Sequence, residues 1–323
     1  MEKRLSRRQF LKTTAGIAFA AGVGARHAVS LRYGGSFASY AEAAESPEKV
    51  DLAVIKSTSP EAATIAAVEA LGGIGKFIKS GDVVVIKPNM AFPNPPGWGN
   101  TTNPEVVSAI AKLCIDAGAR SILIIDHPQA RPEQCLKRTG IADACEKLGS
   151  KKVRVSVETE QRDYKEVKLE NAKALEKTEI HKALLRADVV INIPVAKSHS
   201  ATGASFGMKN LMGLIWDRTY LHQQIDLHQG IADLSTFIKP SLIVVDATRV
   251  LTTRGPEGPG RTEELNTVIA GTDPVAVDSY AVTLSRWNNR VYTPKDVKHI
   301  AAASAMGLGE MDLDKLNVKK MEV

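Results

Sequence analysis

Charged and polar side chains follow four short apolar runs of this sequence, at the points where the runs end. Val83–Ile86 leads into Lys87-Pro88-Asn89, Ile122–Ile125 into Asp126, Val189–Ile193 into Lys197-Ser198-His199, and Leu242–Val245 into Asp246. Lysine supplies positive charge, and the ordinary pKa of histidine lies nearest neutral pH, so this set could bind an anion and move a proton. If the runs are parallel strands, the side chains emerge at one edge of a sheet, where open α/β proteins bind ligands. We therefore expect one site there.

These residues also have structural interpretations. An aspartate directly after a strand commonly forms a turn or cap, so Asp126 and Asp246 are either site residues or turn formers. Lys87, next to a proline, could instead face solvent, although it continues into an irregular loop. A single His199 would more often be structural, but its neighbours favour a site: Lys197, Gly203, Gly207, Lys209 and Asn210.

The stretch 197–213 combines cations, hydroxyls and glycines. Glycine lets backbone N–H groups approach an anion closely, and lysine adds compensating charge. We expect an anionic ligand held by Lys87, Asn89, Lys197, Lys209, Asn210 and Gly255, the last from a Gly- and Pro-rich loop that is otherwise a surface turn. Neither a P-loop nor a dinucleotide-binding glycine motif occurs, which disfavours ordinary nucleotides.

The elements that position these residues alternate between β-rich and helix-period segments. The strands are expected at 51–56, 82–86, 121–125, 153–157, 188–193, 241–245 and 267–270, and the helices at 60–78, 104–117, 132–148, 174–186, 230–237, 274–287 and 294–305. This alternation predicts an α/β fold with a mostly parallel sheet and helices on both faces, in three layers. Residues 91–102 and 198–226 show no clean period and are expected to be binding loops.

Asp278 is a further candidate, because it lies among apolar residues of an expected helix. A buried carboxylate must be paired, hydrogen-bonded or metal-bound, so Asp278 could help to hold a divalent cation. His222, Asp226 and His228 have spacings that a metal could also use.

These motifs together resemble the domain of unknown function family DUF362, over roughly residues 80 to 285. The resemblance rests on Lys87-Pro88-Asn89, Thr101–Glu105, Asp188–Pro194, Lys197-Ser198-His199, Lys209–Gly213, Asp246-Ala247, Gly255-Pro256 and Asp273–Asp278. Family members look like Lys-x-Lys-Thr-His at the strand end, where this chain has Val195–His199 and lacks the first lysine. The resemblance implies no settled reaction. Some relatives carry ferredoxin-type iron–sulfur segments, whose cysteines this chain lacks.

The first residues predict export by the twin-arginine route. Arg7 and Arg8 stand before Phe10 and Leu11, and an apolar run from Ala15 to Val23 follows that is too short for a permanent membrane span. We expect a signal peptide over residues 1–43, a single α/β domain over 44–323, and a periplasmic or other extracytoplasmic location, with the translocase as a transient partner.

The charge and the cysteines exclude several classes of protein. Residues 1–43 hold seven of the 42 basic and two of the 36 acidic residues, so 35 basic and 34 acidic residues remain. No basic stripe indicates nucleic acid as a partner. Cys114, Cys135 and Cys145 form no C-x-x-C pair, which argues against a disulfide framework and against a cysteine-ligated iron–sulfur cluster. We expect them to be buried packing residues.

Two functions remain open. The first is an exported enzyme, or enzyme-like protein, whose cleft binds an anionic substrate or cofactor, with His199 as the acid or base and Asp126 and Asp246 orienting it or holding a divalent cation. The second is a non-catalytic protein that carries a cofactor or assists an exported redox partner.

Overall fold

The computed structural model describes residues 49–157 and 160–323. The expected signal peptide, residues 1–43, lies outside this part of the chain. No helix of the described part is both long enough and apolar enough to cross a membrane.

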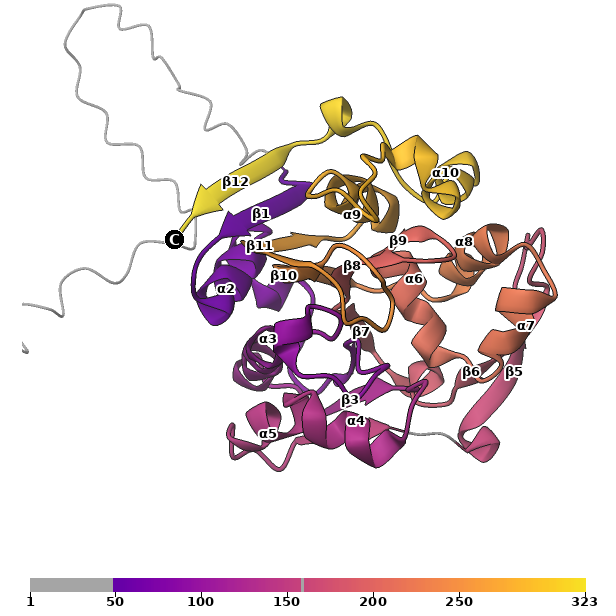
Figure 1. The fold of residues 1–323 in the computed structure, drawn as a ribbon. Coiled ribbons are helices and arrows are strands. Elements are labelled where there is room, and N and C mark those ends of the chain that lie inside the picture. Colours follow the sequence, from indigo (N-terminus) through magenta and orange to yellow (C-terminus); the bar gives the residue numbers. More distant parts are fainter. Residues whose placement is uncertain (1–48, 158–159) are drawn as a thin grey trace, which may run out of the picture. The chain divides into compact units, whose positions relative to one another are not determined.

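A central sheet carries the fold, and most of its neighbouring strands are parallel (Figure 1). Its strands are, in spatial order, β12 (Val318–Glu322), β1 (Leu52–Lys56), β11 (Thr262–Gly271), β10 (Leu242–Leu251), β7 (Val189–Asn192), β2 (Val83–Lys87), β3 (Ser121–Asp126) and β4 (Val153–Val157). The pairs from β10 to β4 are parallel, as is β1 with β12, whereas β11 runs antiparallel to both neighbours. The expected parallel order therefore holds for the part of the sheet that bears the candidate site.

Helices cover both faces of this sheet, because its strands are apolar on both sides. Val84 and Ile86 of β2 pack into one core cluster, and Val85 between them packs into the other. The first cluster contains α2 (Pro60–Ala70), α3 (Pro104–Asp116) and α5 (Ile141–Glu146), which α4 (Pro132–Arg138) adjoins. The second contains α6 (Gly207–Asn210), α7 (Arg218–Gln223), α8 (Leu227–Phe237), α9 (Pro274–Val282) and α10 (Lys298–Ala305). The three-layer α/β prediction is confirmed.

Capping residues start several helices where the sequence predicts them. The side chains of Ser59, Asn103 and Asp273 accept hydrogen bonds from backbone N–H groups of the first turns of α2, α3 and α9, each ahead of a proline. The expected start at Pro294 is different, because Pro294–Asp296 forms a separate 3-10 turn and α10 begins at Lys298.

The prediction of a helix at 174–186 is wrong. This segment instead contains β6 (Lys177–His181), which pairs antiparallel with β5 (Tyr164–Lys168) in a small second sheet. A carboxylate oxygen of Asp233 on α8 accepts hydrogen bonds from the N–H groups of Lys173, Ala174 and Leu175 at 2.7–3.1 Å. These bonds take the donors at the start of the segment and hold it in a non-helical turn.

Glycines shorten two other expected helices. The helix predicted over 60–78 ends at Ala70, and Gly72 and Gly73 follow with φ of 105° and 81°. The helix predicted over 132–148 divides at Gly140, whose φ is 74°. Such angles lie in the left-handed region, which favours glycine and interrupts a helix. The helix predicted over 274–287 likewise ends early, at Val282.

Strands extend into the segment 198–226, which shows no clean period and was expected to be a loop. β8 (Val195–His199) ends in this segment, runs parallel to β10 and forms a hairpin with β9 (Gly203–Ser205). His199 is therefore a strand residue rather than a loop residue, and both it and Lys197 on the same strand are buried.

The three cysteines are buried free thiols in α3, α4 and α5, as predicted. Burial raises the pKa of the Cys114 and Cys145 thiols to about 12.

Candidate functional site

A cavity of about 50 Å³ lies where β2, β3 and β8 meet the segment around α6 and α7. Its lining residues include Lys87, Asn89, Phe92, Asp126, Gln129, Lys197, His199, Lys209, Asn210, Met212, Arg218 and His222. Six of the expected site residues converge there with His199: Lys87, Asn89, Asp126, Lys197, Lys209 and Asn210.

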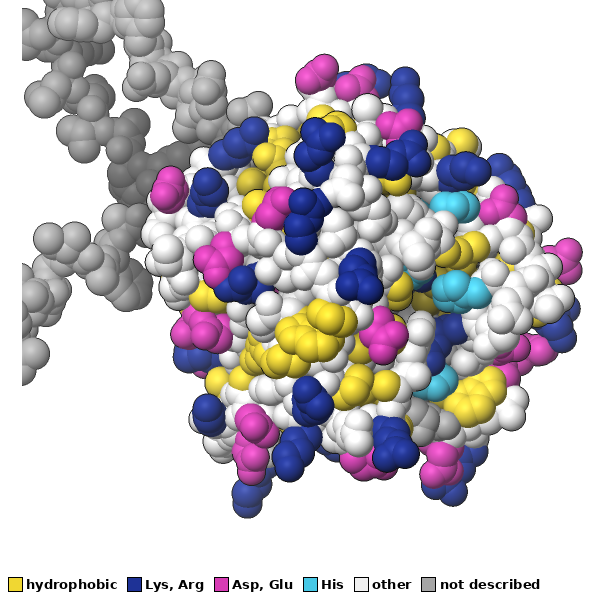
Figure 2. All heavy atoms as spheres, in the orientation of Figure 1, with side chains coloured by type: hydrophobic (Ala, Val, Ile, Leu, Met, Phe, Trp, Pro, Cys, Tyr) yellow, Lys and Arg dark blue, Asp and Glu magenta, His cyan; other side chains and the backbone are white. Residues whose placement is uncertain are grey.

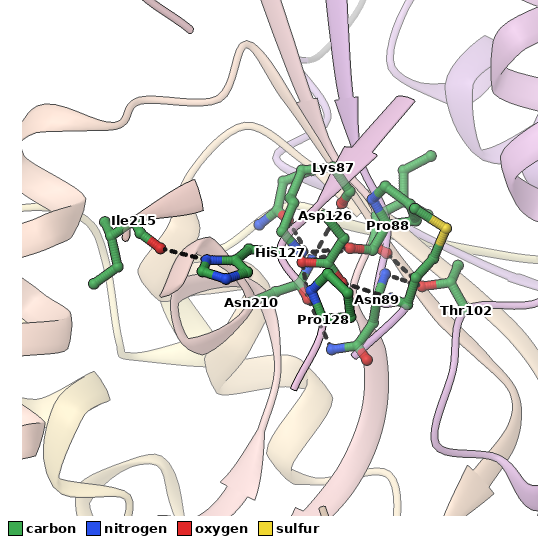
Figure 3. Close-up of polar contacts among 12 residues, drawn as sticks. Lys87, Pro88, Asn89, Thr102, Asp126, His127, Pro128, Asn210 and Ile215 are labelled. Carbon is green, nitrogen blue, oxygen red and sulfur yellow. Dashed lines mark hydrogen bonds and ion pairs between the residues drawn. The ribbon is translucent and has the colours of Figure 1, made fainter. Parts of the chain in front are cut away.

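A buried ion pair forms the floor of this cavity (Figure 3). Lys87 and Asp126 are the last residues of the parallel neighbours β2 and β3, and Lys87 Nζ lies 2.9 Å from Asp126 Oδ1. The other carboxylate oxygen, Oδ2, accepts a hydrogen bond from the N–H of Met90 at 2.6 Å. Lys87 Nζ also donates to Asn210 Oδ1 at 3.3 Å. Burial lowers the pKa of Lys87, and the nearby Asp126 charge opposes that shift.

Gly213 lets the backbone approach this ion pair. A Cβ atom at this position would lie 2.1 Å from Asp126 Oδ1 and 2.8 Å from Lys87 Nζ. The carbonyl of Gly213 also accepts a hydrogen bond from the N–H of His127, at 3.0 Å. Any larger residue would displace the pair, so this position requires glycine.

Three asparagines tie the cavity wall together. Asn210 Oδ1 accepts from Asn89 Nδ2 at 2.9 Å, and Asn210 Nδ2 donates to Asn192 Oδ1 at 2.9 Å. Figure 3 shows Asn210 and Asn89 beside the Lys87–Asp126 pair. The side-chain amides therefore fix α6 against the end of β2.

Lys197 approaches the cavity from β8. Its Nζ donates to the carbonyl oxygen of Asn100 at 2.7 Å and to Asn89 Oδ1 at 3.2 Å, and it lies 5.7 Å from the centre of the Phe92 ring. These partners are neutral. Burial, with smaller effects from neighbouring lysines, lowers the pKa of Lys197 to about 7.

Lys209, on α6, is the least satisfied of the lysines. Its Nζ contacts Met212 Sδ at 3.4 Å, and a thioether is a weak acceptor. Burial, followed by the positive charge of Arg218, lowers the pKa of Lys209 to about 7. Near pH 7 the neutral amine and the ammonium form of Lys209 are therefore nearly equal in free energy.

Arg218 adds a fourth cation, from the start of α7. Its Nη1 and Nη2 donate to the backbone carbonyls of His127 and Pro128 at 2.5 and 2.9 Å. Among the described residues that line the cavity, Asp126 supplies the only carboxylate. When all four cations are protonated, the lining carries an excess of three positive charges.

The two histidines of the lining present opposite hydrogen-bonding groups. His199 Nδ1 accepts from the N–H of Ala201 at 3.1 Å, which places the ring hydrogen on Nε2. His222 Nδ1 lies 2.8 Å from the carbonyl of Arg218 and must donate to it, so Nε2 keeps a lone pair. One imidazole can donate and the other can accept.

His199 differs from the sequence-based expectation in its pKa. Burial, together with the charges of Lys209 and Lys197, lowers this pKa to about 2. The argument from the ordinary histidine pKa therefore does not apply, because His199 is neutral at neutral pH. Lys197 and Lys209 are the groups that titrate there.

Asp246 and Asp278 do not join the cavity lining. Asp246 Oδ2 accepts from the N–H of Asn103 at 2.7 Å, and Oδ1 accepts from the N–H and hydroxyl of Thr248. Asp278 accepts from the N–H groups of Gly207 and Met208 at 2.7 and 3.0 Å. Both carboxylates are buried, and burial raises the pKa of Asp278 to about 7. They anchor the starts of α3 and α6.

Gly255 lies beside the cavity, while its neighbour Pro256 lines it. The N–H of Gly255 donates to Ser198 Oγ at 3.1 Å, and a Cβ atom here would meet the backbone of Ser198. The glycine allows this loop to pack against β8.

The described residues contain no group of three or more His, Cys, Asp or Glu side chains that could hold a metal ion. Of the candidate ligands, His222 lines the cavity, Asp226 caps α8 and the ring of His228 stacks on that of His299. The oxygens of Asp126 and Asp278 already accept protein hydrogen bonds.

The predicted anion site lacked several residues of the cavity lining, among them Phe92, Gln129, Arg218 and His222, the last of which was considered only as a metal ligand. Phe92, Arg218 and His222 fall within 91–102 and 198–226, which were expected to be binding loops. An N-cap signal, Asp217 before Arg218, marks the start of α7 and would have placed the last two on one helix. In Figure 2 histidine side chains reach the surface on the side where α7 and α8 lie, and acidic and basic side chains intermingle over the face shown.

Comparison with known proteins places the site within a described family. The domain family "Domain of unknown function (DUF362)" matches residues 84–283, which include every cavity residue named above. A thylakoid-associated protein of Synechocystis is 26% identical over 272 residues, which cover 80% of this chain and 79% of that protein.

Two solved structures are similar at low identity. The lactate racemase apoprotein of Thermoanaerobacterium thermosaccharolyticum is 15% identical, with a TM-score of 0.44, over 73% of this chain and 58% of that one. A Thermotoga maritima protein is 14% identical, with a TM-score of 0.37, over 64% and 56%. This chain thus spans somewhat over half of each of these proteins.

Proposed function

Because this chain belongs to the DUF362 family, whose domain contains the whole cavity, we propose that the cavity binds a small anion and catalyses acid–base chemistry on it. The observation that carries the proposal is the charge of the lining, in which four cationic side chains face one carboxylate. This proposal makes the protein an enzyme.

Anion binding follows from the cost of burying charge. An unpaired ammonium group away from water is strongly disfavoured, and the lowered pKa values of Lys197 and Lys209 express that cost. An anion between Lys197, Lys209 and Arg218 would supply the missing negative charge. A cavity of about 50 Å³ suits a carboxylate or phosphate-sized group rather than a nucleotide.

Acid–base chemistry is supported by the two imidazoles. His222 Nε2 offers a lone pair that can accept a proton, and the neutral His199 offers an N–H that can donate a hydrogen bond to the bound molecule. Asp126 acts by holding Lys87 in its charged form.

The test is binding of defined anions. Phosphate, sulfate, acetate and lactate should raise the melting temperature saturably, and more strongly at pH 6 than at pH 9, because the lysines lose their protons above about pH 7. Lys209→Met should weaken the tightest anion by at least about tenfold, roughly the effect of losing one charge-assisted hydrogen bond.

Lys137→Met is the matched control, since Lys137 is exposed on α4. Equal binding by the Lys209→Met and Lys137→Met proteins would refute the site. A visible chromophore in the purified protein would instead favour the accessory redox role.

Export is a separate part of the proposal, supported by Arg7, Arg8 and the apolar run that follows. Replacing both arginines by lysine should leave the precursor inside the cell, because the route reads the arginine pair itself. Fractionation followed by immunoblotting measures this, and Arg26→Lys with Arg32→Lys is the control. Normal export of the Arg7→Lys, Arg8→Lys protein would contradict the route.

A further inference from the structure

We infer that Lys209 is a nucleophile that forms an imine with a small 2-oxo acid held in the cavity. This inference deepens the proposed function and rests on it, because the carboxylate of the 2-oxo acid would be the bound anion. It adds the substrate class and a covalent step.

The contacts of the four cations single out Lys209. Lys87 is paired with Asp126, Lys197 donates to two carbonyl oxygens, and Arg218 donates to two backbone carbonyls. Within the described part of the chain, the sulfur of Met212 is the only hydrogen-bond partner of Lys209 Nζ. Its nitrogen is therefore buried at the cavity wall without an oxygen acceptor that would bind its N–H groups and favour the charged ammonium form.

The remaining cations suit the carboxylate end of such a molecule. Arg218 has five N–H donors and uses two of them on the carbonyls of His127 and Pro128, which leaves donors for a carboxylate. Lys197 adds a second positive charge. A 2-oxo acid carries its electrophilic carbon next to the carboxylate, so anchoring the carboxylate in this small cavity brings that carbon to the wall where Lys209 lies.

His222 and solvent supply the proton transfers. The Nζ lone pair forms the bond to the carbonyl carbon, the C=O π electrons move to oxygen, and His222 Nε2 takes a proton from Nζ, while the Nε2–H of His199 donates a hydrogen bond to that oxygen. The oxygen then receives the proton held by His222 and a second proton from solvent and leaves as water, while the nitrogen lone pair forms the C=N bond of the protonated imine. One proton is consumed for each imine formed, and no oxidant or reductant is needed.

The protonation of Lys209 agrees with this role. Burial and Arg218 lower its pKa to about 7, so a large fraction of the amine is unprotonated near neutral pH. An exposed lysine keeps a pKa near 10.4 and reacts slowly there.

Reductive trapping tests the inference. The full chain is incubated with pyruvate and sodium cyanoborohydride at pH 7, digested, and mapped by mass spectrometry. We expect one carboxyethyl group on the peptide that contains Lys209, with a rate that reaches half its maximum near pH 7.

Lys209→Arg is the decisive variant, because it keeps the positive charge and removes the nucleophile. It should lose the adduct and keep phosphate-induced thermal stabilisation, whereas Lys137→Arg should keep both. The absence of an adduct, an adduct on Lys197, or equal labelling of exposed lysines would overturn the inference.

Phosphate stabilisation of the unchanged protein separates the two ideas. If phosphate stabilises but pyruvate is not trapped, the imine is wrong and the anion site stands. If neither occurs, the proposed function fails as well.

Discussion

Two largely buried polar regions of this protein satisfy their charges differently. Asp278 and Asp246 accept two and three hydrogen bonds respectively and support the starts of helices. In the cavity, Lys197 and Arg218 donate only to neutral oxygens and Lys209 contacts a sulfur. Burial alone therefore does not identify a site. The hydrogen-bond partners of each buried charged group do identify it. Groups whose hydrogen bonds are all made within the protein stabilise the fold, whereas groups without such partners can bind a ligand.

The largest change in the free energy of unfolding should come from the region of Asp278 and Asp246, whose carboxylates have hydrogen-bond partners in the protein. Asp278→Ala leaves the buried N–H groups of Gly207 and Met208 without acceptors, and we expect a loss of about 4 kcal/mol in the free energy of unfolding. Urea denaturation measures it. Asp226→Ala is the control, since Asp226 accepts two N–H bonds at an exposed cap and should cost about 1 kcal/mol. If the two variants lose the same free energy of unfolding, burial does not explain the stabilising effect of Asp278.

Asp126 belongs to both regions, because it satisfies Lys87 and lines the cavity. Asp126→Ala leaves the Lys87 ammonium buried without its partner, and we expect a loss of about 3 kcal/mol. Asp116→Ala breaks the exposed Lys112–Asp116 pair and should cost less than about 0.5 kcal/mol. Added phosphate should restore part of the loss only in the Asp126→Ala protein.

The two regions should respond to pH in opposite directions. The pKa of Asp278 is raised to about 7, so the folded state binds the extra proton and stability falls as pH rises from about 4 to 7. The pKa values of Lys197 and Lys209 are lowered to about 7, so stability rises from pH 7 towards 10, by about 2 kcal/mol for each lysine up to pH 9. Urea denaturation at pH 5, 7 and 9 should show a minimum near 7. A monotonic profile would contradict this assignment.

The smallest expected change is an increase in stability. Lys209→Met replaces an unsatisfied buried amine with an apolar side chain of similar length, and we expect about 1 kcal/mol of added stability at pH 7. The variant should also lose part of the rise between pH 7 and 9. Thermal and urea denaturation without added anion measure both. A clear destabilisation would mean that Lys209 already has a structural partner.

Much of the cavity could be predicted from the sequence, because residues at the ends of neighbouring parallel strands lie at the same edge of the sheet. Lys87 and Asp126 end neighbouring parallel strands, so their convergence follows from the sheet alone. Lys209 and Asn210 were found through the glycines and cations around them. The fold class followed from the alternation of buried strands with capped helices, such as those that begin after Asn103 and Asp273.

Other features depended on partners far away in the sequence. Asp246 carries the same strand-end pattern as Asp126, yet its oxygens accept from Asn103 and Thr248. The 174–186 segment forms a strand that pairs with β5, and its start is held by Asp233, which lies on α8. The pKa of His199 reflects burial near two lysines rather than its own chemistry. No local pattern encodes such partners.

The pairing of β1 near the edge of the sheet affects folding during translation. β1 pairs on one side with β11 and on the other with β12, which lies more than 250 residues later in the sequence. During synthesis β1 leaves the ribosome early and has neither neighbour until the last part of the chain emerges. The nascent protein therefore keeps β1 unpaired until β11 has been made, and its sheet is completed only when β12 has been made.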